Sequence, residues 1–138
     1  MSKPPTIVDL TWRGALKFSA RINQASFTLD SAGVDGPSPV GALAAALAGC
    51  MTTDVAHILT RGRHPFRALS SHLEGARLPD DPHRFTRITL HFVIDGDVPE
   101  EAVDRAIQLS REKYCSVWHS MRQDIEFTTS YDVRAPGR

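Results

Sequence analysis

Short alternating runs of apolar and polar residues fill the first thirty positions of the chain. The runs 7–12, 15–22 and 25–30 each have the period-two alternation that β-strands require. Arg13-Gly14 and Asn23-Gln24 separate them, and both dipeptides suit short turns. The pattern therefore predicts three antiparallel strands joined by tight connections.

A nearly continuous apolar run follows and predicts a long helix. Ser38 suits the N-cap and Pro39 the first helical position, while Gly62 marks the end of the helix. Because apolar residues occur on nearly every side, we expect this helix to be central and buried. The most apolar stretch, Val40 to Met51, covers about twelve residues where a membrane span needs about twenty. We expect a core helix and no membrane segment.

The second half of the chain predicts two strands, a helix and a last strand. Residues 66–76 and 85–94 read as strands, and a helix should run from Pro99 to about Lys113. A short helical turn at 116–121 and a strand at 124–133 complete the chain. The order βββ-α-ββ-α-β, with runs of strands separated by isolated helices, predicts an α+β fold with antiparallel sheets.

Composition and charge narrow the class of protein. A length of 138 residues suits one domain, 1–138, with a core of its own. The charges of the 16 basic and 16 acidic residues cancel, so the chain lacks the excess positive charge that nucleic-acid binding normally needs. The first six residues lack the apolar core of a secretory signal, so we expect a cytoplasmic location. A disulfide there would be transient and catalytic, because cytoplasmic thiols are kept reduced.

Two cysteines carry the most plausible chemistry. Cys50 closes the apolar run and Cys115 follows the second helix, a spacing that favours a redox pair over a structural disulfide or a metal site. Helix-terminal carbonyls near Cys115 would disfavour its thiolate, which suits a thiol that resolves a sulfenic acid on Cys50. The alternative is that both are inert core residues, since free cysteine is often buried.

Asp54 and His57 share one helical stripe with Cys50. His57 lies about 10 Å along the axis from Cys50, too far for a direct general base. Asp54 alone would disfavour a thiolate at Cys50, so we expect it to engage His57 or an arginine from another element, unless Asp54 and His57 are simply polar positions of a core helix. The chain has no zinc-type spacing, no GxSxG elbow and no glycine-rich phosphate loop. We expect no metal, no cofactor and no serine hydrolase.

Two stretches of the chain carry a family resemblance. Gly36-Pro37-Ser38-Pro39 leads into the helical segment from Leu43 to Val55, and Lys113-Tyr114-Cys115-Ser116-Val117 follows later. In this order, and over nearly the whole chain, they resemble the OsmC/Ohr family of organic-hydroperoxide reductases, in particular its OsmC-like branch. The resemblance implies an intertwined homodimer with two central helices packed together and active sites at the subunit interface.

The same resemblance implies a peroxidase chemistry. Cys50 would match the peroxidatic cysteine and Cys115 the resolving one, and a dithiol reductant, lipoyl-type in the best-known members, would restore both without metal or flavin. Family members usually pair a glutamate near the start of the central helix with an N-terminal arginine, but Val40-Gly41 stands there in this chain. Arg13 and Arg21 are the candidate cations, the alternative being solvated charges at strand ends.

Two functions stay open at this point. An apolar cleft lined by Leu47, Met51 and Trp118 would favour reduction of small or lipid-like organic hydroperoxides. The other possibility is an OsmC-like protein that binds a hydrophobic small molecule, or senses redox state, without efficient turnover. The two cysteines favour the first, and the missing carboxylate at Gly41 favours the second.

Overall fold

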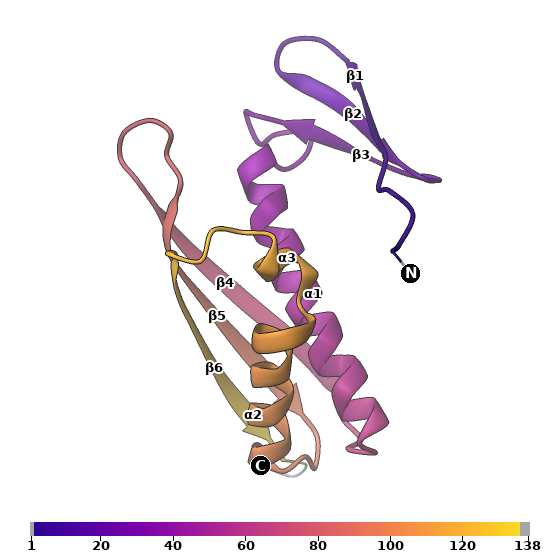
Figure 1. Cartoon of the computed structure of the whole chain (residues 1–138), viewed down its shortest axis with the longest axis vertical. Helices are drawn as coiled ribbons and strands as arrows, with labels where there is room; N and C mark the ends of the chain where they lie inside the picture. Colours follow the sequence, from indigo (N-terminus) through magenta and orange to yellow (C-terminus); the bar gives the residue numbers. More distant parts are fainter. Residues whose placement is uncertain (1, 136–138) are drawn as a thin grey trace. The chain divides into compact units, whose positions relative to one another are not determined.

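The computed structural model describes residues 2–135, and the chain divides into two compact parts (Figure 1). The first part ends at Leu43 and the second begins at Ala44, within the long helix. The observed order confirms the predicted βββ-α-ββ-α-β succession. The elements are β1 (Val8–Trp12), β2 (Lys17–Ile22), β3 (Ala25–Asp30), α1 (Pro39–Arg61), β4 (Ala68–Arg77), β5 (Phe85–Asp95), α2 (Glu100–Leu109), the π-helix η1 (Ser110–Tyr114), α3 (Ser116–His119) and β6 (Glu126–Arg134).

The first sheet, in the order β1-β2-β3, is antiparallel and has one apolar and one polar face. Leu10 pairs with Ala20, and Ala20 pairs with Phe27, so apolar side chains gather on one side. Within these three strands only Ala20 and Asp30 are buried. The sheet thus forms as predicted but leaves most of its apolar face exposed.

Asp30 organises the loop that leads to α1. Its carboxylate accepts backbone hydrogen bonds from Asp35 at 3.1 Å and Ala32 at 2.9 Å, and these bonds lower the pKa of Asp30. Gly36 passes so close to the backbone carbonyl of Thr28 that a side chain there could not fit. The loop therefore depends on a buried carboxylate and on one residue without a Cβ.

Helix α1 begins and ends where the sequence predicts. The Ser38 hydroxyl accepts a hydrogen bond from the amide of Gly41 at 3.0 Å, which is the expected N-cap. By length and composition alone the helix could cross a membrane. However, it buries a single stripe, Leu47, Met51, Val55 and Leu59. The expectation that it is buried on nearly all sides is wrong for the single chain, because its neighbouring elements cover only that stripe.

The second sheet, in the order β4-β5-β6, is mixed. Strands β4 and β5 are antiparallel, but β5 and β6 are parallel, which corrects the expectation of purely antiparallel sheets. The physical reason is the connection: α2 carries the chain back along the sheet, and such a crossover delivers a parallel strand. The inner face of β5 is fully buried together with residues of α2. These core residues are Ile88, Leu90, Phe92, Ile94, Val103, Ala106 and Ile107.

Candidate active site

The second part of the chain brings Cys50 and Cys115 together. Cys115 is fully buried and Cys50 is half-buried, and both are free thiols. The pKa of the Cys115 thiol is raised from 9.0 to about 11; burial is the main cause, the amide of Trp118 opposes the rise, and the neighbouring Cys50 thiol adds to it. Residues that are far apart in sequence thus form a pair of adjacent thiols with unequal exposure.

Cys115 occupies the N-cap of the short helix α3. Its sulfur accepts a hydrogen bond from the amide of Trp118 at 3.3 Å, and its own amide donates to the carbonyl of Ser110 at 2.8 Å. The sequence suggested that helix-terminal carbonyls would surround this thiol, but an amide faces the sulfur instead. The poor acidity of Cys115 agrees with the expectation, although its main cause is burial.

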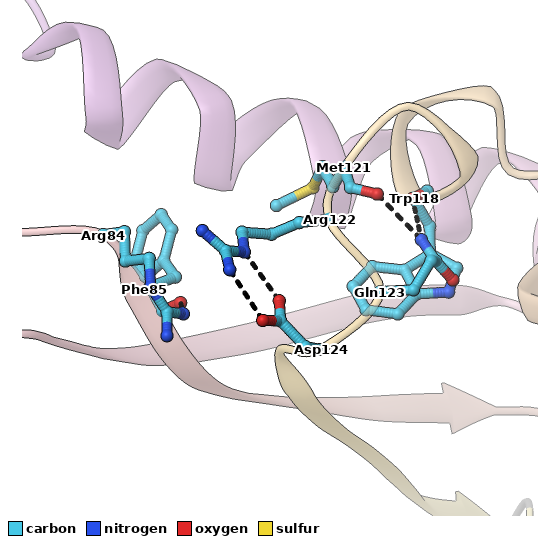
Figure 2. A network of polar contacts seen from close by, with 7 residues as sticks. All are labelled: Arg84, Phe85, Trp118, Met121, Arg122, Gln123 and Asp124. Atoms are coloured by element: carbon cyan, nitrogen blue, oxygen red, sulfur yellow. Dashed lines mark hydrogen bonds and ion pairs between the residues drawn. The ribbon is translucent and has the colours of Figure 1, made fainter.

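A polar network closes the other end of α3 (Figure 2). The side-chain amide of Gln123 donates hydrogen bonds to the carbonyls of Trp118 and Met121, both at 2.9 Å. Arg122 and Asp124 form a two-fold ion pair at 2.6 and 2.7 Å, and the guanidinium lowers the pKa of the Asp124 carboxyl. Because a four-residue helix has little stability of its own, these contacts help to hold the segment that carries Cys115.

Asp54 finds a partner that the sequence did not indicate. The hydroxyl of the fully buried Ser110 donates a hydrogen bond to the Asp54 carboxylate at 2.7 Å. The expected partners were His57 or an arginine. His57 is exposed and lines a hollow of about 580 Å³ together with Asp54 and Arg61, but among the described residues no hydrogen bond or ion pair joins Asp54 to His57 or to an arginine. Ser110 continues the stripe of Val103 and Ile107, so a serine at a core position was the available signal for a buried polar contact.

The model of the OsmC-like protein family matches residues 31–130, a range that contains both thiols and Ser110. The chain belongs to the OsmC-like family. It is 39% identical to Protein YhfA of Escherichia coli strain K12 over 106 aligned residues. The alignment covers 76% of this chain and 79% of that protein. This confirms the resemblance inferred from the two cysteine segments.

Solved structures agree with this OsmC-like assignment. A hypothetical protein from Aquifex aeolicus VF5 has a TM-score of 0.89 and 26% identity, covering 96% of this chain and 98% of that one. An organic hydroperoxide resistance protein OsmC from Legionella pneumophila has a TM-score of 0.71 and 17% identity, covering 96% and 100%. At that identity the second likeness shows the fold alone. Together they confirm the predicted OsmC-like α+β architecture.

The apolar cleft expected in this OsmC-like chain is replaced by packed core. Leu47 and Met51 are fully buried and Trp118 is nearly so, hence none of them lines an open cleft. The Trp118 ring lies 4.6 Å from that of Phe127, between ring centroids. The guanidinium of Arg111 lies 4.8 Å from the Phe127 centroid and 5.9 Å from that of Trp118.

The candidate cations Arg13 and Arg21 belong to the first part of the chain. Both lie on the polar face of the first sheet and line a hollow of about 490 Å³. Arg13 donates to the hydroxyl of Ser19 at 2.8 Å, and Arg21 donates to the carbonyl of Asn23 at 3.3 Å. Their role toward Cys50 stays a prediction.

Proposed function

We propose that this OsmC-like protein is a thiol peroxidase that reduces organic hydroperoxides through Cys50 and Cys115. The observation that carries the proposal is the pair of adjacent free thiols, one half-buried and one buried, in a family with members named organic hydroperoxide resistance proteins. The alternative of two inert core cysteines gives no reason for their adjacency.

The proposed reaction has two covalent steps and one reductive step. The Cys50 thiolate attacks the terminal peroxide oxygen, the O–O bond breaks, the alcohol leaves, and Cys50 becomes a sulfenic acid. The Cys115 sulfur then attacks the Cys50 sulfur, and water leaves as the disulfide forms. A dithiol, for which a lipoyl-type compound is our candidate, reduces the disulfide and is itself oxidised.

The unequal environments of the two thiols support this division of roles. Cys50 is accessible enough to meet a peroxide, whereas Cys115 is buried and its raised pKa keeps it protonated near neutral pH. A protonated thiol does not compete for the peroxide, and it supplies the proton that leaves with water when the disulfide forms. A cytoplasmic location, as expected from the sequence, would keep both thiols reduced between turnovers.

We also propose that the protein works as a homodimer whose second copy covers the exposed apolar surfaces. The first sheet exposes Leu10 and Trp12, and α1 exposes Leu43, although each lies on an apolar surface. In the dimer, Arg13 and Arg21 are our candidates for the cation that stabilises the Cys50 thiolate. A cation near Cys50 would favour its thiolate, and the first turn of α1 contains no carboxylate that could hold such a cation in place.

The test is a thiol count after mixing the reduced protein with stoichiometric cumene hydroperoxide. Mass spectrometry should show the loss of two hydrogen atoms in the natural chain and a dimedone-trappable sulfenic acid on Cys50 in Cys115→Ser. The matched control Cys50→Ser should keep its remaining thiol. Both thiols surviving for minutes in the natural chain would refute the peroxidase.

The runner-up function is a hydrophobic-ligand-binding or redox-sensing protein without efficient turnover. The observation in its favour is the uncharged Pro39-Val40-Gly41 start of α1, where peroxidases of this family usually carry a glutamate. A sensor would form the disulfide once but would not cycle. Steady consumption of cumene hydroperoxide with dihydrolipoamide as the electron source therefore separates the two functions.

A further inference from the structure

Two matched pairs of residues face each other across α1 and η1. On α1, Cys50 and Asp54 are four residues apart, which places them one turn apart on the same face. Ser110 begins η1 and Cys115 follows its last residue; a backbone hydrogen bond of 2.8 Å from the Cys115 amide to the Ser110 carbonyl spans five residues and closes a single π turn. Asp54 bonds to Ser110, and Cys50 neighbours Cys115.

The π turn decides which residue faces Cys50. In an uninterrupted α-helix, the residue one turn after Ser110 would be Tyr114. In the observed structure Tyr114 is 49% exposed and Cys115 is fully buried. The extra residue in the turn therefore delivers the thiol, and not the phenol, to the inner side.

We propose that the Asp54–Ser110 hydrogen bond and the π turn form a positioning clamp that holds Cys115 against Cys50. The clamp deepens the proposed function, since it assigns positioning residues to the resolving step of the same site. Ser110 is fully buried, and its hydroxyl bonds to an ionisable group, a stronger contact than one between neutral groups. Among the described residues, the bond to Asp54 is the one hydrogen bond that the Ser110 side chain makes from η1 to α1.

The clamp can be tested on disulfide formation without any peroxide. In glutathione buffers, two protein thiols and one oxidised glutathione give one Cys50–Cys115 disulfide and two reduced glutathiones, so atoms and electrons balance. The equilibrium constant measures how well the protein presents one thiol to the other. A residue that contributes only to the stability of the fold should leave this equilibrium constant unchanged.

The variant Ser110→Ala removes the donor and should lower this equilibrium constant about tenfold, which corresponds to about 1.4 kcal/mol. Thr52→Ala is the matched control, because Thr52 also links α1 to another element, through a 2.8 Å hydrogen bond to Ser71 of β4. The control should keep the natural value. An unchanged constant in Ser110→Ala, or an equal fall in Thr52→Ala, would overturn the clamp.

A double-mutant cycle gives a second measurement that does not depend on Ser110→Ala alone. Asp54→Ala should cause a similar fall, and the double variant should fall no further than either single variant. Asp54→Asn keeps an acceptor oxygen for the Ser110 hydroxyl and should restore most of the constant. Additive losses, or no restoration by Asn in a variant with natural circular dichroism, would contradict the proposal.

Failure of the clamp is distinguishable from failure of the proposed function. If the natural chain forms the disulfide in glutathione buffers but Cys50 ignores cumene hydroperoxide, the peroxidase is refuted and the clamp stands. If Cys50 is oxidised by the peroxide in Ser110→Ala and its disulfide forms at the natural rate, the clamp is refuted and the peroxidase stands. If the natural chain forms no intramolecular disulfide at any glutathione ratio, the clamp fails.

Discussion

The two sheets of this protein have the same number of strands but very different cores. In the first sheet, Leu10 is 56% exposed and Trp12 is 64% exposed, although both lie on the apolar face. In the second sheet, Leu90 and Phe92 are fully buried. Period-two alternation assigns side chains to a face in both cases, but it does not say what covers that face.

The candidate catalytic residues are also divided between the part with a packed core and the part with an exposed apolar face. Both thiols and the Asp54–Ser110 bond lie in the part with its own core, whereas Arg13 and Arg21 lie in the part whose apolar face is exposed. A site that needs precise spacing between two sulfurs benefits from close-packed surroundings. The thiol pair can therefore be examined separately from the cations proposed to activate it.

The largest effect should come from the core of the second sheet. Phe92→Ala removes a fully buried ring and should lower the free energy of unfolding by about 3–5 kcal/mol. Urea unfolding followed by tryptophan fluorescence measures this change. Thr89→Ala, at an exposed position of the same strand, should stay within about 0.5 kcal/mol of the natural chain. Similar values for the two variants would contradict the contrast between the sheets.

A smaller but qualitatively different effect should come from the first sheet. Leu10→Lys places an ammonium on the apolar face and should weaken the proposed dimer by about 2 kcal/mol, roughly thirtyfold in Kd. Sedimentation velocity over a dilution series measures the shift toward monomer. Thr89→Lys adds the same charge at an exposed position of the second sheet and should leave the dimer intact. Equal behaviour of both variants would show that the apolar face has no partner.

The smallest effect should be a pH dependence that originates in the second part. Because folding raises the pKa of Cys115 from 9.0 to about 11, the unfolded chain loses this proton first as the pH rises. The contribution of Cys115 to stability is thus fully present below about pH 9 and is lost toward pH 11. Thermal unfolding across this range should show a steeper decline for the natural chain than for Cys115→Ser. Parallel curves would mean that this thiol titrates normally when folded.

Local signals in the sequence were sufficient for most element boundaries. Strand β3 spans the predicted residues 25–30, and Ser38 caps α1 as its side-chain chemistry requires. The parallel pairing of β6 was missed because strand direction depends on the path of α2, a non-local property. The π turn was missed for a related reason, since the amphipathic period of α2 continues smoothly to Ser110.

The candidate site was predictable in its residue types more than in its connections. A thiol at the end of an apolar run drew attention to Cys50, and the family resemblance paired it with Cys115. The bond between Asp54 and Ser110 joins residues 56 positions apart, so no local pattern could reveal it. The supposed cleft residues Leu47 and Met51 turned out to be core, because apolar composition alone does not distinguish a cleft lining from packed interior.

The single extra residue in the turn from Ser110 to Tyr114 also has an evolutionary meaning. Each residue of an α-helix advances the chain by about 100° around its axis, so substitutions that tightened this turn to a regular α-helical one, with no residue lost, would put Tyr114 on the inner side and swing the second sulfur away from the first. A lineage could thereby discard a resolving thiol while every cysteine codon remained intact. Counting cysteines across relatives would then overstate how many of them share the same redox behaviour.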